Sequence, residues 1–294
     1  MLGAIAGDVI GSVHERTKQK SKAFPLFVKK STFTDDTVLS VAVADAIINN
    51  KFSSENVNEK DNKESYLEKS YLKESYLKES YVHCLKRYGQ DYFSVGYGAS
   101  FKQWIASDEM SPYNSWGNGS AMRVSPVGCA FDEMSVVLQV AEQSAVVTHN
   151  HPEGIKGAQA TAAAVLMARQ GRSKVEIKTY IEQTFDYDLS RSIADIRPDY
   201  TFHVACQKSV PESIIAFLES TDFEDALRNA ISLGGDADTM AAIAGGIAEA
   251  FYGGVPEAIA QQTLKRLDHP LRETTLQFCQ RYVPKYGYSD LSIA

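Results

Sequence analysis

Two stretches of this chain are too apolar for a protein surface, and both have the pattern of a helix. The stretch 37–49, TVLSVAVADAIIN, is apolar on nearly every face, and 240–254, MAAIAGGIAEAFYGG, consists largely of Ala, Gly and Ile. A helix that is hydrophobic all round belongs inside a protein, among other helices. The stretch 154–171 is Ala-rich and ends at a glycine, and 210–235 divides into two short amphipathic helices. Convincing strand patterns are few, so the sequence predicts an all-α bundle.

The length and composition are those of an ordinary globular protein. The chain has 294 residues, 44% of them hydrophobic and 23% charged, and no Pro/Gly/Ser-rich linker divides it, so we expect one domain over 1–294. The net charge of −7 disfavours a nucleic-acid surface. The first stretch, MLGAIAGDVIGSV, is too short and Gly-rich for a membrane span and lacks the basic start of a signal peptide. With four widely spaced cysteines that form no ligand-like pair, these features predict a cytoplasmic protein. We also expect a monomer.

One stretch, 63–82, is built from four near-copies of a pentapeptide, KESYLEKSYLKESYLKESYV. In a helix a period of five turns each copy by about 140°, so its Tyr and Leu side chains spiral around the axis and form no single buried face. Leu-to-Tyr pairs at i,i+4 recur and favour a helix locally. We therefore expect an insertion at about 53–81 that lies outside the core. A partner-binding arm is the functional alternative to a tolerated expansion.

Oxygen donors are crowded at two helix starts. Three stand at each, namely Thr34, Asp35 and Asp36 before one apolar helix and Asp236, Asp238 and Thr239 before the other. One such side chain is enough to cap a helix, and burying further carboxylates beside a core is costly unless something neutralises them. Two such clusters suggest that they meet around a shared cation. The alternative for either cluster alone is ordinary capping.

The kinds of ligand select the kind of metal. Carboxylates and hydroxyls without a Cys or His pair suit hard ions such as Mg²⁺ or Mn²⁺, and four aspartates could hold two of them. The small residues that follow the second cluster would let its helix pack closely beside the helix that follows the first.

Seven motifs occur in this order along the chain: GAIAGDVIGSVHE, TDDT, GYGASFKQW, SWGNGSAMRVSPVG, VTHNHPEG, VPESIIAFL and GGDADTMAAIAGGIAEAFYG. By these motifs the chain resembles the ADP-ribosylglycohydrolase family, which includes the dinitrogenase reductase-activating glycohydrolase and the animal ADP-ribosylhydrolases. The resemblance covers nearly the whole chain except about 53–81. It implies a compact orthogonal helical bundle with a dinuclear Mg²⁺ or Mn²⁺ site, and an enzyme that acts on ADP-ribosylated targets.

The resemblance also implies roles for particular residues. Glu15 matches an acidic residue that reaches the site from a mobile loop, and Glu15 and Asp36 are the catalytic candidates; Asp8 is expected to support the Glu15 loop or the fold. The metal ligands implied are Thr34, Asp35, Asp36, Asp236, Asp238 and Thr239. The substrate contacts implied are Gly96, Gly98, Ser115, Trp116, Gly117, Asn118, Gly119 and His149.

Glycine-rich backbone and helix starts suit the two phosphates of ADP-ribose, because exposed N–H groups can approach them. His149 is expected to donate to a phosphate and His151 to be a structural loop residue; a zinc pair of the two lacks a nearby third ligand. Trp116 could stack on adenine or fill core. Arg123 is expected to be an internal ion-pair partner.

The implied reaction is hydrolysis at the ribose C1, through an oxocarbenium-like state, with a carboxylate accepting the proton of the attacking water. Arginine-linked ADP-ribose is the first expected substrate, and serine- and nucleobase-linked forms stay open. One alternative is a two-metal phosphohydrolase acting on a nucleotide pyrophosphate. Another is a non-catalytic ADP-ribose-binding protein.

Overall fold

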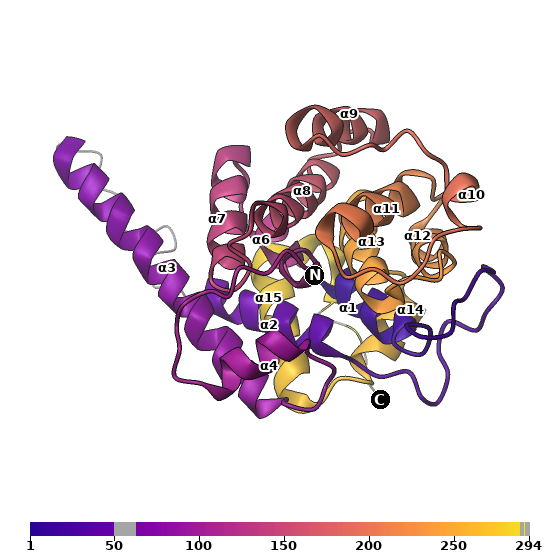
Figure 1. The fold of residues 1–294 in the computed structure, drawn as a ribbon, viewed down its shortest axis with the longest axis horizontal. Helices are drawn as coiled ribbons and strands as arrows, with labels where there is room; N and C mark the ends of the chain where they lie inside the picture. Colours follow the sequence, from indigo (N-terminus) through magenta and orange to yellow (C-terminus); the bar gives the residue numbers. More distant parts are fainter. Residues whose placement is uncertain (50–62, 289–290, 292–294) are drawn as a thin grey trace.

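The computed structural model of the chain describes residues 1–49, 63–288 and 291, with backbone only for 63–76. Within these residues there is no strand, only an isolated bridge between Gly117 and Ala205. The prediction of an all-α bundle is therefore confirmed. Its helices run in several directions around a common interior (Figure 1). They are α1 (Leu2–Gly11), α2 (Asp35–Ile48), α3 (Lys63–Asp91), α4 (Ala99–Ala106), α5 (Gly119–Met122), α6 (Ser125–Ala130), α7 (Met134–Val146), α8 (Pro152–Arg169), α9 (Lys174–Phe185), α10 (Ile193–Ile196), α11 (Cys206–Leu218), α12 (Phe223–Ile231), α13 (Ala237–Tyr252), α14 (Glu257–Leu264), α15 (His269–Tyr282) and a short 3-10 helix (Pro284–Tyr286).

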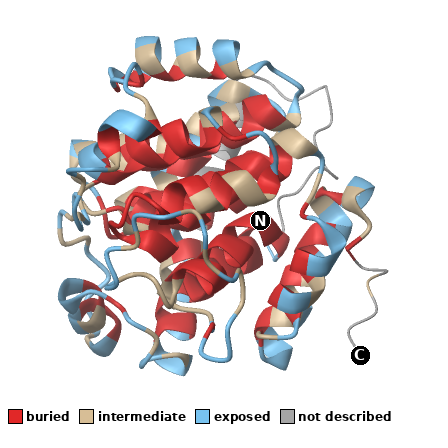
Figure 2. Ribbon diagram, turned by 90° about the vertical axis from the view of Figure 1, so that its right-hand side faces the viewer, coloured by how far each residue is buried: buried red, intermediate tan, exposed pale blue. Residues whose placement is uncertain are grey.

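The most apolar predicted helices form the centre. In α2 every residue from Asp36 to Ile48 is buried, and in α13 every residue from Ala237 to Ala250. Figure 2 shows buried helical segments in the middle of the bundle and exposed outer faces on the helices around them. A helix that is apolar all round has no polar face to turn to water, which explains this placement.

Helix α13 packs most closely against α1, and the small residues of both make the contact possible. A Cβ added to Gly7 would lie 2.1 Å from the carbonyl oxygen of Ala241, and one added to Gly245 would lie 2.3 Å from that of Gly3. The expectation that α13 packs closely beside the helix of the first cluster is wrong, because α1 lies against most of α13 and α2 touches it only slightly. Bare backbone on two facing helices lets their axes approach, and α1 carries the glycines that α2 lacks.

Helix α3 extends from the body of the molecule at its N-terminal end (Figure 1). Its C-terminal half packs on α2, where Leu77, Tyr81 and Leu85 are buried in the core. The expectation that the pentapeptide array lies outside the core is therefore wrong for its last copies. The side chains of the earlier copies, and residues 53–62 of the expected insertion, lie outside the described residues.

All four cysteines are buried and free of disulfides. Among the helices that the structure describes, none is both long enough and apolar enough for a bilayer span.

Candidate metal centre and substrate cavity

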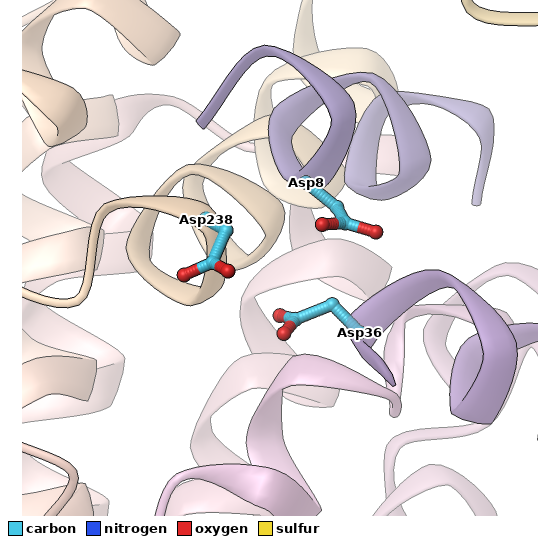
Figure 3. Close-up of side chains that lie close together, drawn as sticks. All are labelled: Asp8, Asp36 and Asp238. Atoms are coloured by element: carbon cyan, nitrogen blue, oxygen red, sulfur yellow. The ribbon is translucent and has the colours of Figure 1, made fainter. Parts of the chain in front are cut away.

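Three carboxylates from three helices meet at one point. Asp8 comes from α1, Asp36 from the start of α2 and Asp238 from the start of α13, and one oxygen of each lies within 4.8 Å of the other two. Figure 3 shows the three side chains pointing toward the same space. The close contact of α1 with α13 brings the first and third together, so the glycines of these helices determine the geometry of the site.

At the start of α2 the capping role falls to a threonine. The Thr34 hydroxyl accepts a hydrogen bond from the backbone N–H of Asp36 at 3.4 Å, so neither aspartate is needed for this purpose. Asp36 is 3% exposed, and its Oδ2 accepts from the Thr239 hydroxyl at 3.1 Å. Its Oδ1 has no hydrogen-bond partner among the described residues. A buried carboxylate oxygen without a protein partner is costly, and its position fits a ligand of a bound cation.

The start of α13 supplies the opposite wall. Asp236 stands at the N-cap position but makes no side-chain capping bond; its Oδ2 accepts from the Asn118 side-chain amide at 2.8 Å. Asp238 accepts from the backbone N–H of Thr239 at 2.9 Å. The two predicted clusters therefore meet, as the sequence suggested.

Asp8 was not assigned to the site from the sequence, and the structure places it in the cluster. Its carboxylate accepts from the backbone N–H of Thr34 at 2.9 Å, from the Thr34 hydroxyl at 2.7 Å and from the backbone N–H of Thr37 at 3.1 Å, and it also binds the Thr37 hydroxyl. Asp8 thus fixes the start of α2 to α1. The sequence signal that could have identified Asp8 as a site residue is an ionisable side chain inside an otherwise apolar helix.

The electrostatics of the cluster favour a bound cation. Burial and then the charge of Asp238 raise the pKa of Asp8 to about 7, and the same causes raise that of the partly buried Asp35 to about 7. Burial, followed by neighbouring carboxylates, also raises the pKa values of Asp36 and Asp236 well above the usual range. Among the described residues no ion pair reaches any of these carboxylates. Their oxygen-only donor set fits hard divalent cations.

Asp35, Asp36, Asp236 and Asp238 line part of a cavity of about 660 Å³, and Asp8 lies behind them, outside its lining. Glu15, on the turns after α1, lines it too; its side chain is 30% exposed, and burial and the charge of Asp238 raise its pKa. Every predicted site residue borders this cavity, so sequence motifs that are far apart in the chain converge on one space. They are Glu15, Thr34, Asp35, Asp36, Gly96, Gly98, Ser115, Trp116, Gly117, Asn118, Gly119, His149, Asp236, Asp238 and Thr239.

The glycines before α4 leave room in the cavity wall. Gly96 has φ +119°, and a Cβ there would lie 3.1 Å from Asp35 Oδ1, so this position needs glycine on both counts. Gly98 has an ordinary φ, and a Cβ there would meet nothing within 4 Å. The space beside Gly98 is open cavity.

The segment 115–119 is held between two other segments. Ser115 donates from its backbone to the Thr148 carbonyl at 3.4 Å, and Asn118 donates to the Val204 carbonyl at 2.7 Å. A Cβ added to Gly119 would lie 3.1 Å from His149 Nε2, so this glycine is required for the close approach of the histidine.

The cavity wall also contains aromatic residues, and the sequence predicts only some of them. Trp116 is 47% exposed and therefore is not a core residue. Tyr113 and Phe202 also line the cavity; no sequence pattern pointed to them, because both stand in irregular segments. His151 caps α8 by accepting from the backbone N–H of Glu153 at 3.1 Å, which confirms a structural role.

The expectation that Arg123 is an ion-pair partner is wrong. Its guanidinium is fully buried, and it donates to the Ser144 carbonyl and to the Thr148 hydroxyl, each at 2.8 Å, with no carboxylate among its described partners. The expectation rested on the rule that a buried arginine usually requires a counter-ion. Here a backbone carbonyl and a hydroxyl are its partners instead.

Fold and site together define a class: an all-α protein with a buried carboxylate centre, suited to hard divalent cations, at one end of a glycine-lined cavity. A family model narrows this class, since the model of ADP-ribosylglycohydrolase matches residues 1–290. The chain belongs to the ADP-ribosylglycohydrolase family.

Curated relatives and a solved structure agree with this assignment. The chain is 25% identical to ADP-ribosylhydrolase ARH3 of Xenopus tropicalis, with 86% of each chain covered, and 26% identical to ADP-ribosylhydrolase ARH3 of Homo sapiens, with 89% of this chain and 87% of the relative covered. A solved structure described as an ADP-ribosylglycohydrolase-related protein complex superposes with a TM-score of 0.65 over 96% of both chains, at 20% identity. That likeness shows the fold.

Proposed function

We propose that this protein is a metal-dependent hydrolase that cleaves the glycosidic bond at the ribose C1 of ADP-ribosylated targets and releases ADP-ribose. The observation that carries the proposal is the group of buried carboxylates around the partnerless Asp36 Oδ1, at one end of a cavity of about 660 Å³, in a chain of this family. Relatives that bear the name ADP-ribosylhydrolase support the substrate class.

The proposed cofactor is a pair of Mg²⁺ or Mn²⁺ ions. The residues that would hold them are Thr34, Asp35, Asp36, Asp236, Asp238 and Thr239. Bound hard cations would supply Lewis-acid chemistry and lower the pKa of water. The chain contributes the positioning: Asn118 fixes one oxygen of Asp236, and Asp8 fixes the Thr34 hydroxyl.

Glu15 is the proposed general base. It lines the same cavity as the aspartates, and a carboxylate whose pKa is raised by burial and by Asp238 is a stronger proton acceptor than an exposed one. Asp36 would share in catalysis through its position at the centre of the cluster.

The glycine-lined wall is the proposed site for the rest of the substrate. The open space beside Gly98 and the backbone of Ser115, Gly117 and Gly119 suit phosphate oxygens, and His149 would add a side-chain donor. Trp116 offers an exposed ring on which adenine could stack.

The test is incubation with a panel of defined conjugates, namely peptides with arginine- or serine-linked ADP-ribose and DNA with a nucleobase-linked one. Each is assayed after chelation and after addition of Mg²⁺ or Mn²⁺, and the products are identified by mass. We propose arginine-linked ADP-ribose as the first substrate. Release of intact ADP-ribose only with metal is expected. Release of a nucleoside monophosphate would favour the phosphohydrolase, and binding without turnover of any conjugate would favour a non-catalytic reader.

A further inference from the structure

The cavity wall contains a buried cation that is not neutralised by a carboxylate. Arg123 is fully buried, and its Nη2 donates to the Ser144 carbonyl and the Thr148 hydroxyl. Within the described part of the chain neither Nε nor Nη1 has a hydrogen-bond partner. Leaving two guanidinium nitrogens without partners in the interior costs stability. Such a cost is understandable if the positive charge performs a task at this position.

The Arg123 contact continues to a histidine that faces the cavity. Thr148 Oγ1 lies 2.7 Å from His149 Nδ1, and a Cβ placed on Gly119 or Gly117 would lie 3.1 or 3.9 Å from His149 Nε2. The His149 ring is therefore bound at Nδ1 from inside the protein, while Nε2 points at the glycine-rich segment 115–119. A chain of three side chains connects a buried charge to the cavity.

The direction of these hydrogen bonds follows from what each group can do. A guanidinium only donates, so Thr148 Oγ1 accepts from Arg123 and still has one proton to give. Donation of this proton to His149 Nδ1, 2.7 Å away, makes Nδ1 the accepting nitrogen and leaves the ring proton on Nε2.

Charge favours the same arrangement. The bare nitrogen is the negative end of a neutral imidazole, and here it faces the side on which the Arg123 guanidinium lies. Burial, and next the charge of Arg123, lower the pKa of His149 well below its ordinary value, so the ring stays neutral. The opposite tautomer would direct an N–H toward the buried cation.

We propose that Arg123 and Thr148 are positioning residues that hold His149 in its neutral Nε2–H form, so that the cavity presents a fixed N–H donor beside Gly117 and Gly119. The group that such a donor selects is an anionic oxygen. Only the identity of this oxygen, a phosphate oxygen of ADP-ribose, rests on the proposed function. The tautomer itself does not depend on it.

The first experiment reads the tautomer directly, by nitrogen-15 NMR of imidazole-labelled protein at neutral pH without ligand. The chain has six histidines, and the His149 signals are assigned by their loss in His149→Gln. We expect one neutral form protonated at Nε2. A ring protonated at Nδ1, an even mixture of tautomers or an imidazolium would overturn the proposal, whether or not the protein binds ADP-ribose.

The second experiment uses variants of Thr148 and measures ADP-ribose affinity by calorimetry and KM and kcat with a cleaved conjugate. Thr148→Val removes the hydroxyl and keeps the shape; we expect ADP-ribose affinity to fall about tenfold and KM to rise about tenfold, while kcat stays within about threefold. Thr148→Ser should restore affinity. Thr161→Val, at a buried threonine of α8 whose hydroxyl has no partner, is the matched control and should change neither.

The outcomes separate the two proposals. If Thr148→Val binds ADP-ribose as tightly as the wild type, the positioning role is wrong. If the wild type fails to bind ADP-ribose at all, the proposed function is wrong, and the spectrum alone decides the tautomer. If Thr148→Val does not fold, the wild-type spectrum and the Thr148→Ser variant still decide the question.

Discussion

Asp36 is 3% exposed, and one of its carboxylate oxygens accepts no hydrogen bond from any residue that the structure describes. Its neighbours Asp8 and Asp238 are also buried and also acidic, so each charge raises the free energy of the others. Without a cation the site is therefore a source of instability inside the fold. With cations bound, the same geometry becomes a source of stability, because binding to the native state alone stabilises it.

This balance predicts opposite effects of one substitution on activity and on stability. Asp238→Asn removes a buried charge, so we expect kcat to fall by at least about 100-fold while the melting temperature in EDTA rises. The increase in melting temperature that Mg²⁺ gives the wild type should be largely lost. Calorimetric melting with and without Mg²⁺, alongside turnover, measures all three. Asp108→Asn, at an exposed aspartate, is the control. A variant that melts lower than wild type in EDTA would contradict this account of the cluster.

Glu15 differs from the aspartates because it stands on the rim of the cavity, 30% exposed. Glu15→Gln should keep metal affinity within about threefold but lose about 10²–10⁴-fold in kcat, the range typical of a general base. Isothermal titration with Mn²⁺ and steady-state kinetics separate the two effects. Hydrolysis at the wild-type rate would remove Glu15 from the mechanism.

The residues of the site differ in how far the sequence predicts them. Those in the two helix-start clusters are recognisable because capping needs only one oxygen donor, and the surplus stands out locally. Tyr113 and Phe202 reach the cavity only through the tertiary fold, and no local pattern marks them. Arg123 was misjudged because the sequence cannot show that its partners are a carbonyl and a hydroxyl.

At the scale of helices, the contact between α1 and α13 determines where the carboxylates lie. The sequence indicates a close contact through Gly245 and Gly246, but the partner expected from it, α2, is wrong, because small residues are present on several helices and only the fold selects among them. The partner is α1, where Gly3 faces Gly245.

The two adjacent glycines of α13 allow a matched test of this contact. A Cβ on Gly245 would lie 2.3 Å from the backbone oxygen of Gly3, whereas one on Gly246 would lie 3.0 Å from the Ser125 Cβ. We expect Gly245→Ala to lower the free energy of unfolding by about 2–4 kcal/mol and to weaken Mg²⁺ binding. Gly246→Ala should cost much less, because alanine favours the helix and its neighbour is a side chain. Denaturant melts measure both, and equal losses would contradict the packing described.

The helix α3 shows what a repeat pattern can and cannot predict. Its five-residue period led to the expectation of a segment outside the core, but Leu77 and Tyr81 are buried against the bundle. A spiral of apolar side chains still places some residues on the face that contacts the bundle. In the C-terminal copies these residues are Leu77 and Tyr81.

The repeat also makes a register-preserving deletion possible. Removing residues 68–77 joins Leu67 to Lys78, so a leucine again precedes the copy that contains Tyr81. We expect this deletion to leave kcat and Mg²⁺ affinity within a few-fold of wild type and to change the melting temperature little. Leu77→Asn in the full chain should be destabilising by about 2–5 kcal/mol, because it places a polar group in the core. Failure of the deletion variant to fold would show that the earlier copies also pack on the domain.

At the scale of the whole molecule, segments from both ends of the chain meet at the site: α1 and α2 from the start, α13 from near the end and the wall segments from the middle. Helix content could be predicted because hydrophobic periodicity is a local property. The arrangement of helices could not, since it depends on which apolar faces fit together. The family motifs indicate that these distant segments share one site, which hydrophobic periodicity cannot show.

The central claim is hydrolysis at the ribose C1, and the position of the oxygen that water contributes tests it most directly. The protein is given an ADP-ribosylated conjugate with Mg²⁺ in oxygen-18 water, quenched early, and the products are weighed. Unlabelled ADP-ribose kept in the same water corrects for exchange at C1. We predict one oxygen-18 in released ADP-ribose, on the ribose C1, and none in the target. Label in a phosphate group of the product, or left on the target side chain, would contradict cleavage at C1.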